Sequence, residues 1–176
     1  MEGKLKIIYW NASTLRGKAR RVNAFLQDHR ADILLVSETH LRPSDIFKIP
    51  NYHIYRKDEV SPSGQVYRGL AVLVQRRVIH QLIPVTEYGT FQALGILINV
   101  AGKIMRIHSI YRPPGTSLDK MELRSLFDGN IPTIVAGDLN SKHTAWHSSK
   151  ICTTGRILSP GRWFQFAFYR GVDRVA

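Results

Sequence analysis

The chain has 176 residues, with 25 Lys or Arg against 13 Asp or Glu, which gives a formal charge of +12. This length corresponds to one domain, and an apolar content of 44% is enough for a buried core, so a mainly disordered chain is excluded. No apolar run approaches the roughly 20 residues that span a bilayer, and the N-terminus lacks the pattern of a secretory signal, so we expect an intracellular protein. The single cysteine, Cys152, excludes an internal disulfide and a thiolate metal cluster.

The positive charge favours a polyanionic partner, and nucleic acid is the first expectation. The densest basic cluster contains Arg16, Lys18, Arg20 and Arg21, at the start of a predicted helix. A solvated helix face is the alternative interpretation of such a cluster. An anionic membrane surface would attract the same charge, but the sequence shows no basic amphipathic helix with a broad apolar face, so no membrane partner is expected.

In chain order, the first half of the sequence predicts strands on either side of a helix. Residues 4–10 alternate and then become apolar, as in a strand beside a core, whereas residues 18–29 place apolar side chains at helical spacing. Residues 33–36 are continuously apolar, which is typical of a strand covered on both faces. Residues 41–66 are rich in Pro, Ser, Gly and charge, so we expect mostly loop, with a short strand at 53–56.

The second half predicts four more strands and one helix. Strands are expected at 69–75, 91–100 and 103–111, the last two joined by a tight hairpin at Ala101-Gly102. Thr116 with Asp119 resembles a capping box that opens a short helix, and residues 132–136 form another apolar strand. This mixed order indicates helices packed outside a sheet or a pair of sheets, and periodicity does not choose between the two.

Several of these apolar strands end on side chains that suit metal or phosphate chemistry. The strand ends carry Asn11, Glu38, Tyr111, and the pair Asp138 and Asn140. Oxygen-rich sites of this kind suit Mg²⁺, which proteins usually hold with one or two carboxylates. If the ends lie on one rim, the chemistry implied is hydrolysis of a phosphodiester.

In that hypothesis Glu38 holds the ion and Asp138 orients and deprotonates the attacking water. Asn11 and Asn140 fix the geometry by hydrogen bonding without repelling an anion, and Tyr111 contacts the phosphate or the leaving oxygen. Each residue taken alone has an ordinary alternative as a turn former or a core residue. The prediction therefore depends on their conjunction.

The histidines suggest a second possibility. His143 and His147 lie four residues apart, which allows a zinc pair on one helical turn, although no third ligand is evident. The isolated histidines are expected to be packing or surface residues; they are His29, His53, His80 and His108.

Four segments occur as motifs in a recognisable order. They are Trp10-Asn11-Ala12, Ser37-Glu38-Thr39-His40-Leu41, Ile110-Tyr111-Arg112-Pro113-Pro114, and the run from Gly137 to Trp146 (GDLNSKHTAW). Together they resemble the apurinic-endonuclease-like domain of non-LTR retrotransposons, above all that of the jockey-type elements of arthropods. That domain is a member of the endonuclease/exonuclease/phosphatase family, and the resemblance covers approximately residues 4–158.

The resemblance implies a four-layered α/β sandwich with two packed sheets. It also implies a nickase that depends on Mg²⁺, or alternatively on Mn²⁺, and that opens one strand of double-stranded chromosomal DNA. The 3′-hydroxyl produced would prime reverse transcription. A reverse transcriptase domain downstream and a nuclear place of action are further expectations from the same resemblance.

By motif position, Glu38 matches the family's metal ligand, Tyr111 its active-site tyrosine and Asp138 its general base. Asn140 matches the partner asparagine of that base, and Asn11 matches the first active-site asparagine. Contacts with DNA are expected from a group of basic, histidine and tryptophan side chains, namely Arg16, Lys18, Arg112, His143 and Trp146.

Three departures from the family pattern stand out. Ser13 replaces a frequent Asn or Asp, and Glu59 stands where Arg is common. After Leu158 the match ends, so residues 1–158 are expected to form an incomplete domain and residues 159–176 a divergent aromatic and basic tail. The family's final Ser-Asp-His strand has no counterpart, because Asp173 lies in Gly171-Val172-Asp173-Arg174.

This missing strand leaves the activity of the chain open and predicts exposed sheet edges. Two alternatives to an active nuclease follow. One is a DNA-binding fragment without turnover, held by phosphate contacts. The other is a phosphatase of the same family that acts on a small phosphorylated molecule.

Overall fold

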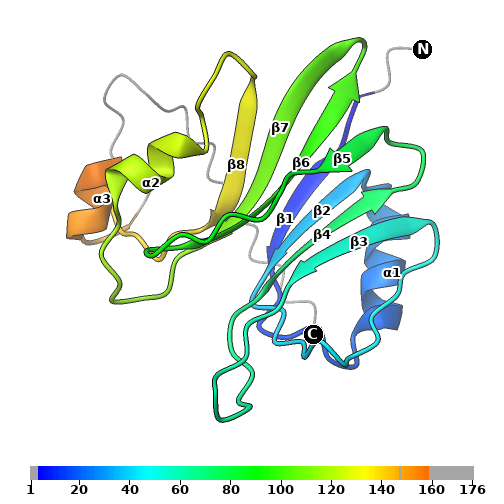
Figure 1. Cartoon of the computed structure of the whole chain (residues 1–176), viewed down its shortest axis with the longest axis horizontal. Coiled ribbons are helices and arrows are strands. Elements are labelled where there is room, and N and C mark those ends of the chain that lie inside the picture. Colours follow the sequence, from blue (N-terminus) through cyan, green and yellow to red (C-terminus); the bar gives the residue numbers. More distant parts are fainter. Residues whose placement is uncertain (1–3, 147, 159–176) are drawn as a thin grey trace. The chain divides into compact units, whose positions relative to one another are not determined.

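The computed structural model describes residues 4–146 and 148–158, in two compact units that divide after Leu139. The first unit contains eight strands and two helices (Figure 1). Their bounds are β1 (Ile7–Asn11), α1 (Ala19–His29), β2 (Ile33–Ser37), β3 (Tyr52–Lys57), β4 (Leu70–Gln75), β5 (His80–Leu82), β6 (Gln92–Val100), β7 (Lys103–Tyr111), α2 (Lys120–Ser125) and β8 (Thr133–Asp138). No helix in these residues is both long and apolar enough to cross a bilayer.

The strands form two four-stranded sheets, in the orders β1-β2-β4-β3 and β5-β6-β7-β8. Each sheet has one parallel pair, β1 with β2 and β7 with β8, and each of these pairs is connected by a helix, α1 or α2. Parallel strands bring their carboxyl ends to the same edge of a sheet. Asn11 is therefore in register with Ser37, and Tyr111 with Asp138.

The two sheets pack face to face, and their strands alternate between two hydrophobic layers. In β2, Ile33 and Leu35 belong to the core between the sheets, whereas Leu34 and Val36 belong to the core beneath α1. All four side chains have no exposed surface, which confirms the predicted strand covered on both faces. The implied pair of packed sheets is confirmed as well, and β1 and β8 are edge strands among the described residues.

Three local features differ from the sequence prediction or refine it. The short strand β5 was not predicted, because three residues carry too little periodicity. Helix α2 begins with Asp119 as its N-cap, whose side chain accepts from the Met121 N–H, so Thr116 is not the cap. The Ala101-Gly102 hairpin is confirmed, with positive φ angles of 50° and 80°.

The second unit, which begins at Asn140, contains a 3₁₀ turn (η1, Thr144–Trp146) and a short helix (α3, Thr153–Leu158). Cys152 connects its parts: the Cys152 N–H donates to the Lys142 carbonyl at 2.9 Å, and its sulfur accepts from the Lys142 and Gly155 N–H groups. Gly155 is required here, because a Cβ at this position would lie 1.9 Å from the Lys142 carbonyl oxygen. The cysteine is thus a local structural residue.

His108 is buried on the face of β7 that points away from the other sheet, opposite Gly95 of β6. Its Nε2 has no hydrogen-bond partner within residues 4–146 and 148–158, and its ring fills the space where a Cβ of Gly95 would lie. Burial, with a smaller contribution from the Arg106 charge, lowers the pKa of His108 to about 4. The sequence-based expectation of a packing histidine agrees with this environment.

We expect this histidine to make the protein sensitive to acid. The unfolded chain takes up a proton near the ordinary pKa of 6.5, whereas folded His108 resists protonation down to about 4. The free energy of unfolding therefore decreases progressively as the pH falls from 6.5 toward 4. The total decrease due to His108 is roughly 3 kcal/mol. Urea unfolding of the His108→Leu variant at several pH values should show a flatter profile than the parent. The same change at the exposed His53 is the control, and equal profiles for parent and His108→Leu would contradict the assignment.

Candidate active site

Side chains from three distant stretches of the chain meet at the carboxyl ends of the parallel strand pairs. The Asn11 Nδ2 donates to Glu38 Oε1 at 3.0 Å and lies 3.5 Å from Asp138 Oδ2. One amide group thus joins the carboxylate that follows β2 to the carboxylate that ends β8. The predicted rim is present for these three residues, and Tyr111 lies beside Asp138 in the strand register.

The backbone at this rim is held in an uncommon conformation. Glu38 has φ of +54°, as has Ser13, and His40 has φ of +47°. Residues other than glycine rarely adopt positive φ, and such positions concentrate at functional sites. Two hydrogen bonds stabilise the arrangement, from the Ala12 N–H to the Ser37 carbonyl and from the Leu15 N–H to the Thr39 carbonyl. The loops after β1 and β2 are therefore fixed against each other.

Tyr9 is a residue of this site that the sequence analysis missed. Its hydroxyl shares a hydrogen bond of 2.6 Å with Ser37 Oγ, directly before Glu38. Burial raises the pKa of Tyr9 well above its ordinary value; the Ser37 hydrogen bond opposes this, and the charges of Asp138 and Glu38 raise it further. The sequence could have indicated this position, because Tyr9 lies two residues before Asn11 and side chains two apart point to the same face of a strand.

Tyr111 is only 6% exposed and belongs to the core between the sheets. Tyr111 thus lies beside Asp138 at the end of β7 and packs in the core between the sheets.

The donor set fits a hard divalent cation. Two carboxylates face one amide group, and Glu38 has no ion pair within 4.0 Å among the described residues. Mg²⁺ commonly uses one or two carboxylates and completes its coordination with water and substrate phosphate. No cluster of three His, Cys, Asp or Glu side chains that could hold a metal ion occurs in the described part of the chain.

Three predicted site residues, Asn140, His143 and Trp146, belong to the second unit. Asn140 has a positive φ of 46°, the type of backbone seen at Glu38. The His143 Nδ1 accepts from the Ala145 N–H at 3.1 Å, and the backbone carbonyl of His143 accepts from the Ser148 N–H. His143 therefore stabilises the turn in which it lies. Trp146 ends the 3₁₀ turn, and His147 of the possible zinc pair lies outside the described residues.

The basic residues predicted to bind DNA differ in how far their side chains are exposed and in what they contact. Arg16 is half exposed and pairs with Asp45 at 3.4 Å. Lys18 instead folds back, donating to the Ala12 carbonyl at 2.9 Å and lying 5.7 Å from the centre of the Trp10 ring. Arg112 is 3% exposed and donates to the Leu139 and Thr116 carbonyls. Its burial favours a structural role over the predicted DNA contact.

Glu59, the departure from the family's usual Arg, has a clear structural role. Its carboxylate accepts from Gln92 Nε2 at 2.5 Å and from Arg68 at 3.3 Å. Gln92 begins β6 and is in register with Tyr111. The Gln92 Oε1 also accepts from the Gly69 N–H at 3.4 Å. Glu59 thereby ties the connection between β3 and β4 to the other sheet, close to the rim.

Comparison with known proteins places this geometry in context. A sequence profile of the endonuclease/exonuclease/phosphatase family matches residues 8–174. The RNA-directed DNA polymerase from mobile element jockey of Drosophila melanogaster is 30% identical over 156 residues, which are 88% of this chain and 17% of that protein. Among solved structures, the endonuclease domain of TRAS1, a telomere-specific non-LTR retrotransposon, has a TM-score of 0.66 at 16% identity and covers 88% of this chain and 69% of its own.

The human Nocturnin catalytic domain has a TM-score of 0.59 at 16% identity, over 78% of this chain and 64% of its own. At such low identity the solved structures show a common fold only. The profile match is the stronger result, because it covers nearly the whole sequence, including Asn11, Glu38 and Asp138. The chain therefore belongs to the endonuclease/exonuclease/phosphatase family.

Proposed function

We propose that this chain is a Mg²⁺-dependent DNA endonuclease that nicks one strand of a duplex for a non-LTR retrotransposon. The observation that carries the proposal is the meeting of the Glu38 and Asp138 carboxylates around Asn11 in a chain of net charge +12. A carboxylate pair suits a cation and a water nucleophile, whereas the overall charge suits a polyanionic substrate.

In the proposed reaction, the Asp138 carboxylate takes a proton from a water molecule whose oxygen attacks the phosphorus. The P–O3′ bond breaks, and the departing oxygen takes up a proton to leave a 3′-hydroxyl and a 5′-phosphate. Asn11 orients Asp138 and Glu38 through its amide, and Tyr111 supports the phosphate side of the rim. Bound Mg²⁺, held by Glu38, would offset the charge that develops on the phosphoryl oxygens.

The wider setting follows from the relatives and is part of the proposal. The chain spans 17% of the length of the jockey protein that it matches, whose printed name is RNA-directed DNA polymerase. We infer a reverse transcriptase domain downstream, for which the released 3′-hydroxyl is the primer, and action in the nucleus, where chromosomal DNA is found.

Nicking of supercoiled plasmid tests the proposal. The chain should convert it to the open circle with Mg²⁺ or Mn²⁺ and not with EDTA. Glu38→Gln should raise the Mg²⁺ concentration needed for half-maximal rate and lower the rate about 100-fold at physiological Mg²⁺, because a neutral amide binds the cation poorly. Asp28→Asn, on the exposed end of α1, is the matched control and should keep the parent rate.

The positive charge also favours a second candidate, a DNA-binding domain without turnover. Steep salt dependence of duplex binding combined with no Mg²⁺-dependent nicking would identify it. Hydrolysis of a small phosphomonoester in preference to plasmid would instead identify the phosphatase alternative. Nicking that is equal in Mg²⁺ and EDTA would contradict the metal-dependent mechanism.

A further inference from the structure

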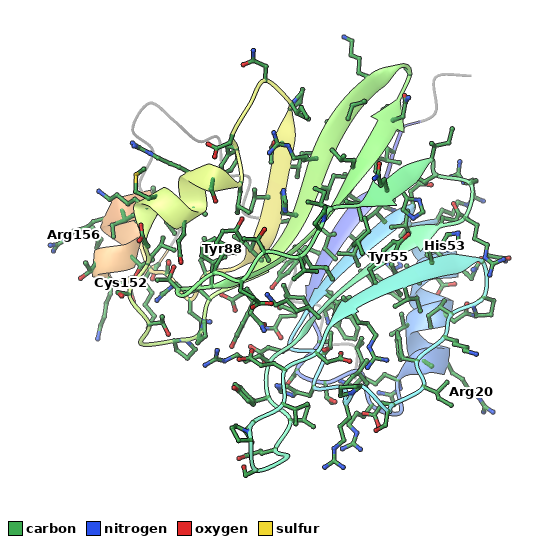
Figure 2. All side chains as sticks on the ribbon, viewed as in Figure 1. Arg20, His53, Tyr55, Tyr88, Cys152 and Arg156 are labelled. Atoms are coloured by element: carbon green, nitrogen blue, oxygen red, sulfur yellow. The ribbon has the colours of Figure 1, made fainter. Side chains whose placement is uncertain are left out.

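A pocket of about 480 Å³ lies next to the active-site rim, between the loops that follow β1 and β2. Leu15, at its base, donates to the Thr39 carbonyl, so the pocket is fixed with respect to Glu38. Its walls include Arg16 and Arg20 on one side and Ile46 on the other, together with Asp45, which pairs with Arg16 at 3.4 Å. Arg20 projects outward from α1 (Figure 2).

Ile46 is the most exposed large apolar side chain in the described residues, at 86%. Scattered apolar side chains on a surface are common and need no explanation. What distinguishes Ile46 is its surroundings, because it lies in the pocket wall with two arginines and follows the exposed Arg42 by four positions. An apolar side chain that shares a pocket wall with Arg20 and lies in the same turn as Arg42 fits a surface that is itself both anionic and apolar.

The turn that carries Ile46 is held rigidly. Arg42 and Asp45 exchange two hydrogen bonds, from the Arg42 N–H to the Asp45 carboxylate at 2.8 Å and from the Asp45 N–H to the Arg42 carbonyl at 2.9 Å. Arg56 of β3 donates to the backbone carbonyls of Arg42 and Asp45. Phe47, which follows Ile46, is buried in the core beneath α1. The backbone that carries Ile46 is thus already fixed, so the turn loses little conformational freedom when Ile46 contacts a partner.

We propose that the turn Arg42–Phe47 is a DNA-contacting element in which Ile46 packs against the deoxyribose surface of the minor groove. Arg20, across the pocket, contacts an adjacent phosphate, whereas Arg16 stays paired with Asp45 of the turn. Duplex DNA offers this combination, because apolar sugar faces line a groove bordered by phosphates, and proteins that enter the minor groove commonly insert apolar side chains. The inference rests on the proposed function and adds a contact that does not involve the reacting atoms.

The test measures binding of the full chain to a fluorescent DNA duplex in EDTA, so that no strand is cut. Ile46→Gln should weaken binding about fivefold or more while leaving the slope of log K against log salt unchanged, because no phosphate contact is lost. Arg20→Gln should instead make that slope shallower by about 1. Ile46→Leu, which keeps the apolar surface, should bind as the parent does.

Ile79→Gln is the matched control, because Ile79 is 76% exposed but follows the end of β4 that lies away from Glu38. Parent-like binding by Ile46→Gln, with nicking retained, would overturn this inference and leave the proposed function intact. No duplex binding by the parent chain would overturn both. Binding of the parent to anionic lipid vesicles that is lost in Ile46→Gln, with DNA binding unchanged, would assign the turn to a membrane surface instead.

Discussion

Replacement of Asp138 by Asn should lower the rate of plasmid nicking by about 100- to 10,000-fold at saturating Mg²⁺, the range typical for loss of a general base. An amide cannot accept the proton of the attacking water. It does keep an oxygen that can accept from Asn11, whose Nδ2 lies 3.5 Å from the Asp138 carboxylate, so the rim should retain its shape. The measurement is the initial rate of open-circle formation across a range of Mg²⁺ concentrations.

Comparison with Glu38→Gln separates the two carboxylates by role. Loss of the metal ligand should shift the Mg²⁺ dependence, whereas loss of the base should reduce the maximal rate with little shift. Far-UV circular dichroism of both variants checks that the fold is intact. Nicking by Asp138→Asn at the parent rate would remove Asp138 from the mechanism, and a shift in Mg²⁺ dependence alone would reassign it as a metal ligand.

The second large effect is expected for stability. Gly137→Ala should destabilise the protein by about 3 kcal/mol or more, because a Cβ at Gly137 would lie 1.9 Å from the backbone oxygen of Ile110, its partner in register on β7. The added methyl group meets backbone, which cannot rotate away as a side chain can. Strand β8 must therefore move away from β7, and Asp138 must move with it. Urea unfolding measures the loss.

Gly64→Ala provides the matched comparison. Gly64 has φ of +80° in the connection between β3 and β4, and a Cβ there would meet nothing within 4 Å. Its replacement should cost only about 1 kcal/mol, from the left-handed backbone alone. A loss for Gly137→Ala no larger than that for Gly64→Ala would show that β8 can adjust, contrary to the close packing described.

Much of the fold could be predicted because the strands and α1 carry strong periodic signals. The run Ile33–Val36 is apolar at every position, and the structure buries both of its faces. Strand β5 has only three residues, His80–Leu82, and depends on pairing with β6 rather than on its own pattern. The start of α2 was placed too early, because both Thr116 and Asp119 are capable caps and only the backbone path selects between them.

In the candidate site too, residues placed by local sequence patterns could be predicted, whereas those placed by contacts with distant residues could not. Asn11, Glu38 and Asp138 could be identified because each ends or follows an apolar strand, and the two parallel pairs bring such ends together. Arg112 could not be placed, because its sequence is equally compatible with an exposed phosphate contact and with the buried bonds to Leu139 and Thr116. Burial of a long cation depends on acceptors supplied by residues distant in the chain.

The two parallel strand pairs also determine when the site can form as the chain folds. The unit β1-α1-β2 brings Asn11 and Glu38 together, and the unit β7-α2-β8 brings Tyr111 and Asp138 together, each through contacts close in sequence. The Asn11–Asp138 contact alone spans 127 residues, so it forms only after the two halves dock. A chain in which only one of the two units β1-α1-β2 and β7-α2-β8 has folded therefore lacks the complete set of site residues.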